Sequence, residues 1–396
     1  MNKKIIFPAV LVVLLVFCFV FASCENTKDF GFEEKEGAMT ITDYYGDGGD
    51  VKIPNKIKGK IVRFIEPEAF KGKNLTGITI PDSVVTIGDS AFQDNQLTSV
   101  TIPNSVISIG NDAFKNNQLT NVTIPDSVTS IGDRAFMDNQ LTSVTISNKV
   151  TAIGTEMFKN NQLTSVIIPN DITTIGDEAF SNNQLTSITI SDSVTTIGDM
   201  AFMNNQLANV TIPGAVTSIG DKAFLDNPIT GFSVASDNTV YSINNSFLLG
   251  DNGKQIIWYF GNERTISIPN GVTTIGDYMF SDRQITSVTI PNTVTAIGEG
   301  AFMNNQITRI VLPNSVRRIE ANAFAGNQLN RITIGRNVVL GSGALNPNFE
   351  SQYNTYANNY SNDIMLSRDF AFGREAGGYS TDLFHPNWGL GWYVPQ

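Results

Sequence analysis

The sequence predicts an α/β solenoid in which every 22-residue repeat contributes one short strand and one short helical turn. Two observations predict this fold: a constant spacing of similar segments, and the same apolar pattern within each segment. Such periodicity is the signature of supersecondary units that stack on one another instead of closing around a single core. The ten repeats begin at Leu75, Leu97, Leu119, Leu141, Leu163, Leu185, Leu207, Glu263, Ile285 and Ile307.

The first half of each repeat predicts the strand. In the repeat LTNVTIPDSVTSIGDRAFMDNQ, apolar side chains stand at Leu119, Val122 and Ile124. This spacing is typical of a strand with one buried face. Pro125 follows and lacks the N–H that a sheet ladder needs, so we expect the strand to end there.

The second half of the repeat predicts an inward-facing segment and a helical turn. Val128 and Ile131 should point into the stack, because the first position is β-branched and the second is isoleucine in all ten repeats. Gly132–Asp133 is typical of a turn followed by a helix N-cap. Ala135–Phe136 should then form one short helical turn.

Two residue columns predict how the repeats hold together. Phenylalanine occurs at one position of every repeat and is interpreted as a core spine, not as a ligand site. The second column is an asparagine three residues after each phenylalanine, and Arg283 is its one exception. A structural ladder of stacked amides is favoured over a sugar-binding row for this column. The phenylalanines are Phe92, Phe114, Phe136, Phe158, Phe180, Phe202, Phe224, Phe280, Phe302 and Phe324.

The repeat resembles a known family. The pattern L-x-x-[IV]-x-I-P, followed by V-x-x-I-G-x-x-A-F and N-Q, is similar to the BspA-like class of bacterial leucine-rich repeats over residues 39 to about 340. The resemblance implies a curved leucine-rich-repeat solenoid with its strands on the concave side. It also implies an extracellular or surface protein that adheres to host matrix proteins or to other bacteria.

The N-terminus predicts export. Lys3 and Lys4 precede an apolar run and a small-residue exit, which is typical of a signal peptide over residues 1–23. Ala22 and Ser23 before Cys24 resemble a lipoprotein lipobox, so Cys24 is the expected lipidation site. Simple cleavage and a retained span are the alternatives. Residues 24–38 should form a hydrated tether, which places the protein outside the cytoplasm, lipid-anchored at the outer membrane or cell surface.

Breaks in the repeat define the remaining organisation. Residues 39–74 are predicted to be an N-terminal capping repeat, and residues 75–345 the solenoid. Within it, residues 229–262 should form a protruding β-hairpin around Asp251–Gly253, with Trp258 and Tyr259 as candidate partner contacts. A modified repeat with its own small core is the favoured interpretation of this insertion, and a partner-docking surface is the alternative. Residues 346–396 are interpreted as an aromatic C-terminal cap or binding module, with Trp388 and Trp392 as candidate contacts.

A local basic patch provides further candidates for partner binding. Arg309 and Arg331 occupy the same position in adjacent repeats, so we expect them about 5 Å apart on one strand face. Arg317 and Arg318 should lie nearby. Such a like-charge pair is costly unless an anion or a carboxylate is shared between the two side chains. Neutralisation by local acidic residues and binding of an anionic ligand are both open.

Composition excludes several classes of function. The net charge of −11 becomes −13 without Lys3 and Lys4, which disfavours nucleic-acid binding and leaves the lipid as the only expected membrane contact. His385 is the single histidine, and the two cysteines lie in the N-terminal segment. We therefore expect no enzyme, no metal site and no cofactor.

The expected function is multivalent binding. The outward strand positions carry mainly threonine, serine and asparagine and predict no pocket for a small ligand. Many weak contacts with an extracellular protein or cell-surface ligand fit this surface better, as in an adhesin. A passive structural protein of the cell envelope is the main alternative, and a binder of ice-like surfaces is a minor one.

Overall fold

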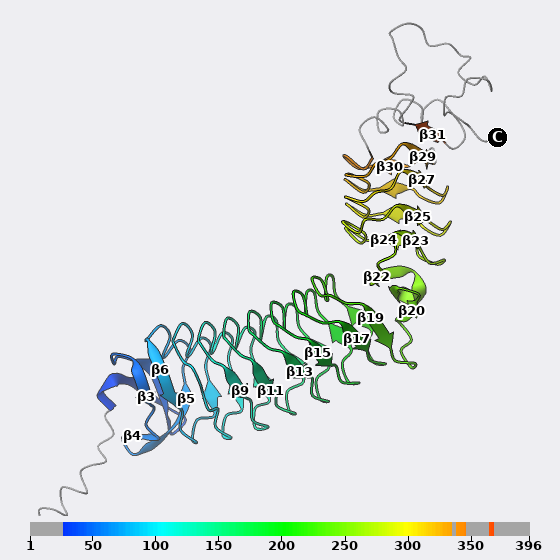
Figure 1. Cartoon of the computed structure of the whole chain (residues 1–396). Helices are drawn as coiled ribbons and strands as arrows, with labels where there is room; N and C mark the ends of the chain where they lie inside the picture. Colours follow the sequence, from blue (N-terminus) through cyan, green and yellow to red (C-terminus); the bar gives the residue numbers. More distant parts are fainter. Residues whose placement is uncertain (1–26, 335–337, 346–363, 368–396) are drawn as a thin grey trace, which may run out of the picture. The chain divides into compact units, whose positions relative to one another are not determined.

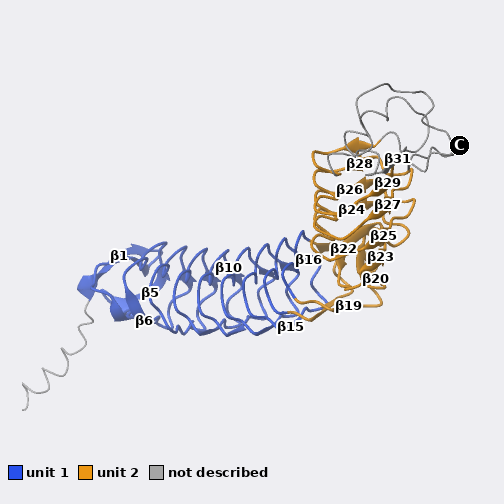
Figure 2. Ribbon diagram, turned by 45° about the horizontal axis from the view of Figure 1, so that its top comes forward, with its two compact units in different colours: residues 1–206, 220–227 blue, residues 207–219, 228–396 orange. Residues whose placement is uncertain are grey.

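The computed structural model describes residues 27–334, 338–345 and 364–367 (Figure 1). The chain divides into two compact units, residues 1–206 with 220–227 and residues 207–219 with 228–396 (Figure 2). Within the described ranges, no helix is long and apolar enough to cross a membrane. The predicted signal peptide, Cys24, Trp388 and Trp392 lie outside the described residues.

The first unit is a stack of coils held together by strand ladders, which are parallel except where β1 pairs with β2 and β4 pairs with β5. One ladder runs in the order β1-β2-β5-β7-β8-β10, and others comprise β3-β6, β9-β11, β13-β15 and β12-β14-β16. Strands one repeat apart pair in exact 22-residue register, for example Ser143 with Asn121. The strands are β1 (Phe30–Lys35), β2 (Ala38–Tyr44), β3 (Gly49–Lys52), β4 (Lys56–Ile57), β5 (Lys60–Ile65), β6 (Leu75–Thr79), β7 (Thr86–Ile87), β8 (Ser108–Ile109), β9 (Asn121–Thr123), β10 (Ser130–Ile131), β11 (Ser143–Thr145), β12 (Ala152–Ile153), β13 (Ser165–Ile167), β14 (Thr174–Ile175), β15 (Ser187–Thr189) and β16 (Thr196–Ile197).

The N-terminal end of this unit begins earlier than the sequence predicted. Residues within the expected tether form the short 3-10 helix η1 (Thr27–Asp29) and strand β1, which pairs antiparallel with β2. Phe30 and Tyr44 lie over Phe70, with ring centroids 6.3 and 5.5 Å away. Aromatic side chains therefore cover the first ring of the phenylalanine column. The sequence did not predict this cover, because the charged composition of residues 25–37 indicated a hydrated tether.

The predicted helical turn is wrong. The only helices in the described ranges are the 3-10 segments η1 and η2 (Asp251–Gly253). In the predicted helical segment, Arg134 and Asp138 have φ values of +56° and +55°, which a right-handed helix does not accept. The backbone N–H groups of Arg134, Phe136 and Asp138 instead donate to carbonyls of the next coil at 3.0 to 3.1 Å. Hydrogen bonds between coils thus replace those of a helix, and the fold is a β-solenoid.

The predicted N-cap has a different role as well. The Asp133 Oδ1 accepts a hydrogen bond from the backbone N–H of Thr155, one coil further on, at 2.9 Å. Asn111 receives the equivalent bond from Asp133 at 2.8 Å. This position therefore links neighbouring coils instead of starting a helix.

The predicted phenylalanine spine is present within each unit. In the first unit, the rings from Phe70 to Phe224 stack at centroid distances of 5.1 to 5.7 Å. In the second, Phe280, Phe302 and Phe324 stack at 5.1 and 5.2 Å. These rings are almost wholly buried, so the column is core, as predicted.

The buried asparagine column binds backbone groups. The Asn161 side-chain amide donates to the carbonyls of Phe136 and Phe158, at 3.0 and 3.1 Å. Its Oδ1 accepts from the N–H of Leu141. Amides that bond one another, as the sequence suggested for this column, occur instead in a second column, where Asn182 donates to Asn160 at 2.7 Å.

The second unit has the same architecture, and its main sheet begins with three antiparallel strands. Its main sheet has the order β20-β21-β22-β24-β26-β28-β30, and a second row contains β23-β25 and β27-β29-β31. Strand β31 pairs antiparallel with β29. The strands are β17 (Asn209–Ile212), β18 (Ser218–Ile219), β19 (Gly231–Val234), β20 (Ser242–Asn244), β21 (Phe247–Gly250), β22 (Gln255–Tyr259), β23 (Thr265–Ser267), β24 (Thr274–Ile275), β25 (Ser287–Thr289), β26 (Ala296–Ile297), β27 (Arg309–Val311), β28 (Arg318–Ile319), β29 (Arg331–Ile334), β30 (Val339–Leu340) and β31 (Ile364–Ser367).

Candidate partner-binding surfaces

The outward strand positions of the coils are exposed, as the pattern predicted. On β11 the side chains of Ser143 and Thr145 face solvent, while Leu141 is fully buried. Part of the hydroxyl surface is already used within the stack, because Thr142 and Thr186 each donate to a carbonyl of the preceding coil. These threonines therefore stabilise the stack and are less available to a partner.

The structure places Arg309 and Arg331 side by side. They are direct register partners on the parallel strands β27 and β29, and both side chains are exposed. Neighbouring strands lie about 4.8 Å apart, so the prediction of a close pair is confirmed. Neither residue forms an ion pair with another described residue.

Sequence reasoning missed an apolar residue on the same face. Val311 lies two positions after Arg309 on β27, and side chains two apart on a strand share a face. It is 68% exposed. The signal was a departure from the consensus, since most repeats carry threonine at this position. Ile167 is the equivalent exception on β13 and is 75% exposed.

Arg317 and Arg318 do not extend this arginine pair. Arg318 lies on β28, in the sheet that contains β26 and β30, whereas Arg309 and Arg331 lie in the other row. Arg318 forms an ion pair with Glu320 at 2.5 Å. Arg317 donates to the backbone carbonyls of Asn314 and Val316. The single basic patch expected from the sequence is therefore divided between two rows.

The predicted hairpin is present, but it is part of the sheet. Strands β21 and β22 pair antiparallel around η2, and β22 continues in parallel into β24. Phe247 and Tyr259 pack against Phe280, at centroid distances of 6.2 and 5.4 Å. The hairpin covers the first ring of the second phenylalanine column, as the N-terminal aromatics cover the first column. This aromatic packing agrees with the small core that the sequence interpretation favoured for the insertion.

Trp258 and Tyr259, the two candidate partner contacts of the hairpin, differ in their exposure to solvent. Tyr259 is only 2% exposed, so it is a core residue and is not accessible to a partner. Burial, followed by the hydrogen bond to Glu263 at 2.7 Å, raises the pKa of the Tyr259 hydroxyl. Trp258 is half-buried on the neighbouring position and remains a candidate contact.

The missing asparagine at Arg283 has a physical reason. In a regular repeat the asparagine amide donates to the phenylalanine carbonyl of the preceding coil, as Asn161 does to Phe136. The coil that contains Arg283 follows the hairpin, which has no phenylalanine at that position. The Arg283 guanidinium instead lies over the Tyr259 ring, 5.7 Å from its centroid. A cation–π contact replaces the amide at this boundary.

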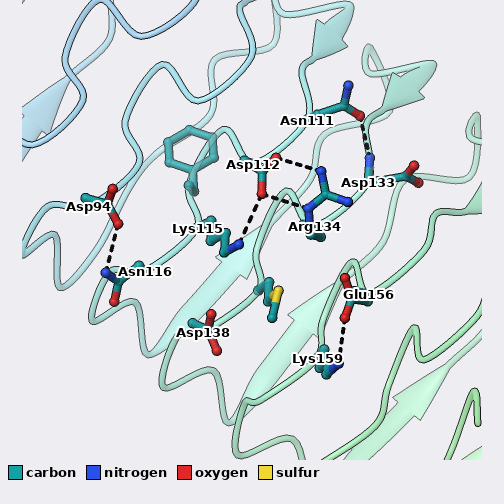
Figure 3. A network of polar contacts seen from close by, with 12 residues as sticks. Asp94, Asn111, Asp112, Lys115, Asn116, Asp133, Arg134, Asp138, Glu156 and Lys159 are labelled. Carbon is teal, nitrogen blue, oxygen red and sulfur yellow. Dashed lines mark hydrogen bonds and ion pairs between the residues drawn. The ribbon is translucent and has the colours of Figure 1, made fainter.

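Several charged side chains on the turns of the first unit are paired with one another (Figure 3). Arg134 donates two hydrogen bonds of 2.9 Å to the carboxylate of Asp112, one coil away. Burial alone would raise the pKa of Asp112, but Arg134 and Lys115 outweigh it and hold that pKa below its ordinary value. Lys159 bridges Glu156 and Glu178 at 2.5 and 2.6 Å. Asp112, Arg134, Glu156, Lys159 and Glu178 therefore neutralise one another across neighbouring coils.

A groove of about 640 Å³ lies in the first unit beside the turn between β1 and β2. Lys35 and Glu36 line one part of it, and Thr86, Ser108 and Ser130 line another. Lys35 is bound to Glu66 at 2.7 Å. Within the described ranges, no group of histidine, cysteine, aspartate and glutamate side chains is arranged to hold a metal ion.

The comparisons with known proteins identify the repeat. The model of the BspA type leucine rich repeat region matches residues 63–186, 173–262 and 254–348. This chain therefore belongs to the BspA-type leucine-rich-repeat family, as the sequence resemblance indicated. Leucine-rich-repeat proteins are generally non-enzymatic scaffolds for protein interaction.

Solved structures share the fold. A leucine rich cell surface protein from Faecalibacterium prausnitzii is 27% identical, with a TM-score of 0.54 over 84% of this chain and 97% of that chain. A leucine-rich repeat protein from Bacteroides ovatus is 21% identical, with a TM-score of 0.51 over 80% and 91% of the two chains. The pneumococcal vaccine antigen PcpA is 19% identical, with a TM-score of 0.53 over 80% and 84%. No curated protein sequence gives a significant match.

Proposed function

We propose that this chain is an exported, lipid-anchored cell-surface protein whose repeats bind extracellular proteins or other cell-surface ligands in an adhesin-like manner. The observation that supports this proposal most directly is that the strand rows present exposed side chains every 22 residues, while the apolar columns are buried in the core. Identical weak contacts along a row multiply through effective concentration when the partner is extended.

The family and the N-terminal sequence support this proposal. The repeat belongs to a family of protein-interaction scaffolds, and a 27% identical relative is a cell surface protein. The charged, apolar and small-residue order that precedes Cys24 supports export and lipidation. Cys24 would then anchor the chain while the repeats remain free to meet a partner.

Binding of labelled chain to matrix proteins and to bacterial cells tests the proposal. The full chain should bind in a saturable manner. A truncated chain lacking residues 346–396 should retain most of this binding if the repeats are responsible, and should lose it if the aromatic tail is the binding module. Envelope defects on gene deletion, without any binding by the purified chain, would support the structural alternative and contradict the adhesin-like role.

Lipidation is tested separately. Metabolic labelling with a fatty-acid analogue should modify the wild-type chain and leave the Cys24→Ser variant unlabelled. A wild-type chain that is released into the medium without lipid would contradict the anchor while leaving partner binding open.

A further inference from the structure

We propose that Arg309 and Arg331, together with Val311, form a recognition site for a carboxylate-rich segment of a protein partner. The inference rests on the proposed partner-binding function and names the chemistry of one contact. The two guanidinium groups project from the same register position of neighbouring strands, on an exposed face.

Arg309 and Arg331 lack the ion pairs that Arg134 and Arg318 form with carboxylates of the described residues. Arg134 is bound to Asp112 one coil away, and Arg318 is bound to Glu320. In contrast, the residue one coil away from Arg309 is another arginine. Like charges directly opposite each other in a sheet are destabilising, so the pair is unfavourable for folding and calls for a shared anion.

The nearby acidic residues are engaged elsewhere. Between Ile285 and Leu345 the sequence contains five arginines and two glutamates. Glu299 accepts a hydrogen bond of 2.7 Å from the Tyr278 hydroxyl, and Glu320 pairs with Arg318. No carboxylate of this stretch is therefore left for Arg309 and Arg331, and the stretch is basic within an acidic protein.

The geometry favours carboxylates on an extended peptide. Each guanidinium can bind a carboxylate through two parallel hydrogen bonds, and the two groups about 4.8 Å apart can share one carboxylate or bind two. Val311 offers an apolar contact for the methylene groups of acidic side chains. The outward positions of β23, β25, β27 and β29 carry only Thr, Ser, Arg and Val, so the row has no aromatic face for a sugar ring.

Fluorescence anisotropy with a labelled oligo-glutamate peptide tests the site on the purified full chain. The wild-type chain should bind oligo-glutamate at low ionic strength and should not bind oligo-glutamine of equal length. The variant R309S/R331S should bind at least about tenfold more weakly, because two charge-assisted contacts are removed. Serine occupies this position in other repeats, including Ser287, so the variant should fold, as circular dichroism would verify.

The variant R317S/R318S is the matched control, because it removes the same charge from the other row. It should bind oligo-glutamate like the wild type. The variant R309K/R331K should have intermediate affinity, since lysine keeps the charge but lacks the planar fork. Equal weakening by the two serine variants would overturn the proposal in favour of overall charge. Binding of dextran sulfate without binding of oligo-glutamate would overturn it in favour of a sulfated polymer.

Parallel assays with protein partners separate this proposal from the proposed function. If R309S/R331S binds partners as well as the wild type does, the adhesin-like function stands and the arginine site is wrong. If the wild type binds oligo-glutamate through the pair but binds no matrix protein or cell, the site stands and the adhesin-like function is wrong.

Discussion

Single polar side chains in this protein act mainly between coils. Asn161 satisfies backbone groups of two successive coils, and Asp133 binds the backbone of the next one. Buried backbone groups without such partners would each cost about 1–3 kcal/mol. The buried asparagine column and the position of Asp133 therefore contribute hydrogen bonds within the scaffold.

The ion pair of Asp112 with Arg134 predicts a pH-dependent contribution to stability. Because the folded-state pKa of Asp112 is lowered, its carboxylate stabilises the fold fully above the unfolded value of 3.8. The contribution disappears as the pH falls through the lower folded-state pKa. Asp112→Asn should lower the free energy of unfolding by about 1 kcal/mol at neutral pH, and the difference from wild type should vanish in acid.

Urea unfolding at neutral and acidic pH measures this difference. Asparagine keeps the positive φ of +53° found at Asp112, so the substitution tests the charge and not the backbone. Asp82→Asn removes an exposed carboxylate that forms no ion pair with another described residue and should have little effect. A pH-independent loss in Asp112→Asn would contradict the assigned role of the carboxylate.

At the scale of elements, the turn between Ile131 and Asn139 shows where sequence patterns fail. Ala and Phe in this segment are compatible with a helical turn, and the sequence alone gave no reason to reject one. The preference for hydrogen bonds to the next coil becomes visible only when the coils are stacked, with Arg134 and Asp138 at positive φ.

A glycine precedes the equivalent turn in most repeats, and in several of them the neighbouring coil leaves no room for a side chain. A Cβ atom at Gly198 would lie 2.4 Å from the Asp177 Oδ1, whereas at the equivalent Gly276 the nearest atom is the Met279 Cε at 3.6 Å. Gly198→Ala should therefore lower the free energy of unfolding by about 1–3 kcal/mol. Gly276→Ala should leave it unchanged or raise it by up to about 1 kcal/mol.

Hydrogen exchange over the coil that contains each glycine measures these effects. Protection should fall around Gly198 and persist around Gly276. Equal loss of protection in the two variants would show that the backbone conformation, and not the contact with Asp177, decides the preference for glycine.

For the whole molecule, the important feature is that each of the two stacks has its own aromatic cover. Phe30 and Tyr44 cover Phe70 in the first unit, and Phe247 and Tyr259 cover Phe280 in the second. A solenoid needs its terminal coils covered, because an open end exposes core and strand edges. The insertion at residues 229–262 thus contains the N-terminal cover of a second stack.

Tyr259→Ala should destabilise the second stack by about 3 kcal/mol and leave the first unaffected. Hydrogen exchange should increase over residues 264–345 and remain constant over residues 75–206. Tyr259→Phe keeps the ring and removes the hydroxyl bond to Glu263, so about 1 kcal/mol should be lost. Equal destabilisation of both stacks by Tyr259→Ala would contradict this division.

The sequence by itself determined the period, the buried columns and the family, because these depend on residue types that recur every 22 positions. It also predicted that Arg309 and Arg331 are neighbours, since equal positions in adjacent repeats must stack. The tertiary structure alone decided that Tyr259 is core, that Arg317 and Arg318 lie in another row, and that the turn is not helical. These properties depend on what the neighbouring coil or hairpin offers, and that information is absent from any single repeat.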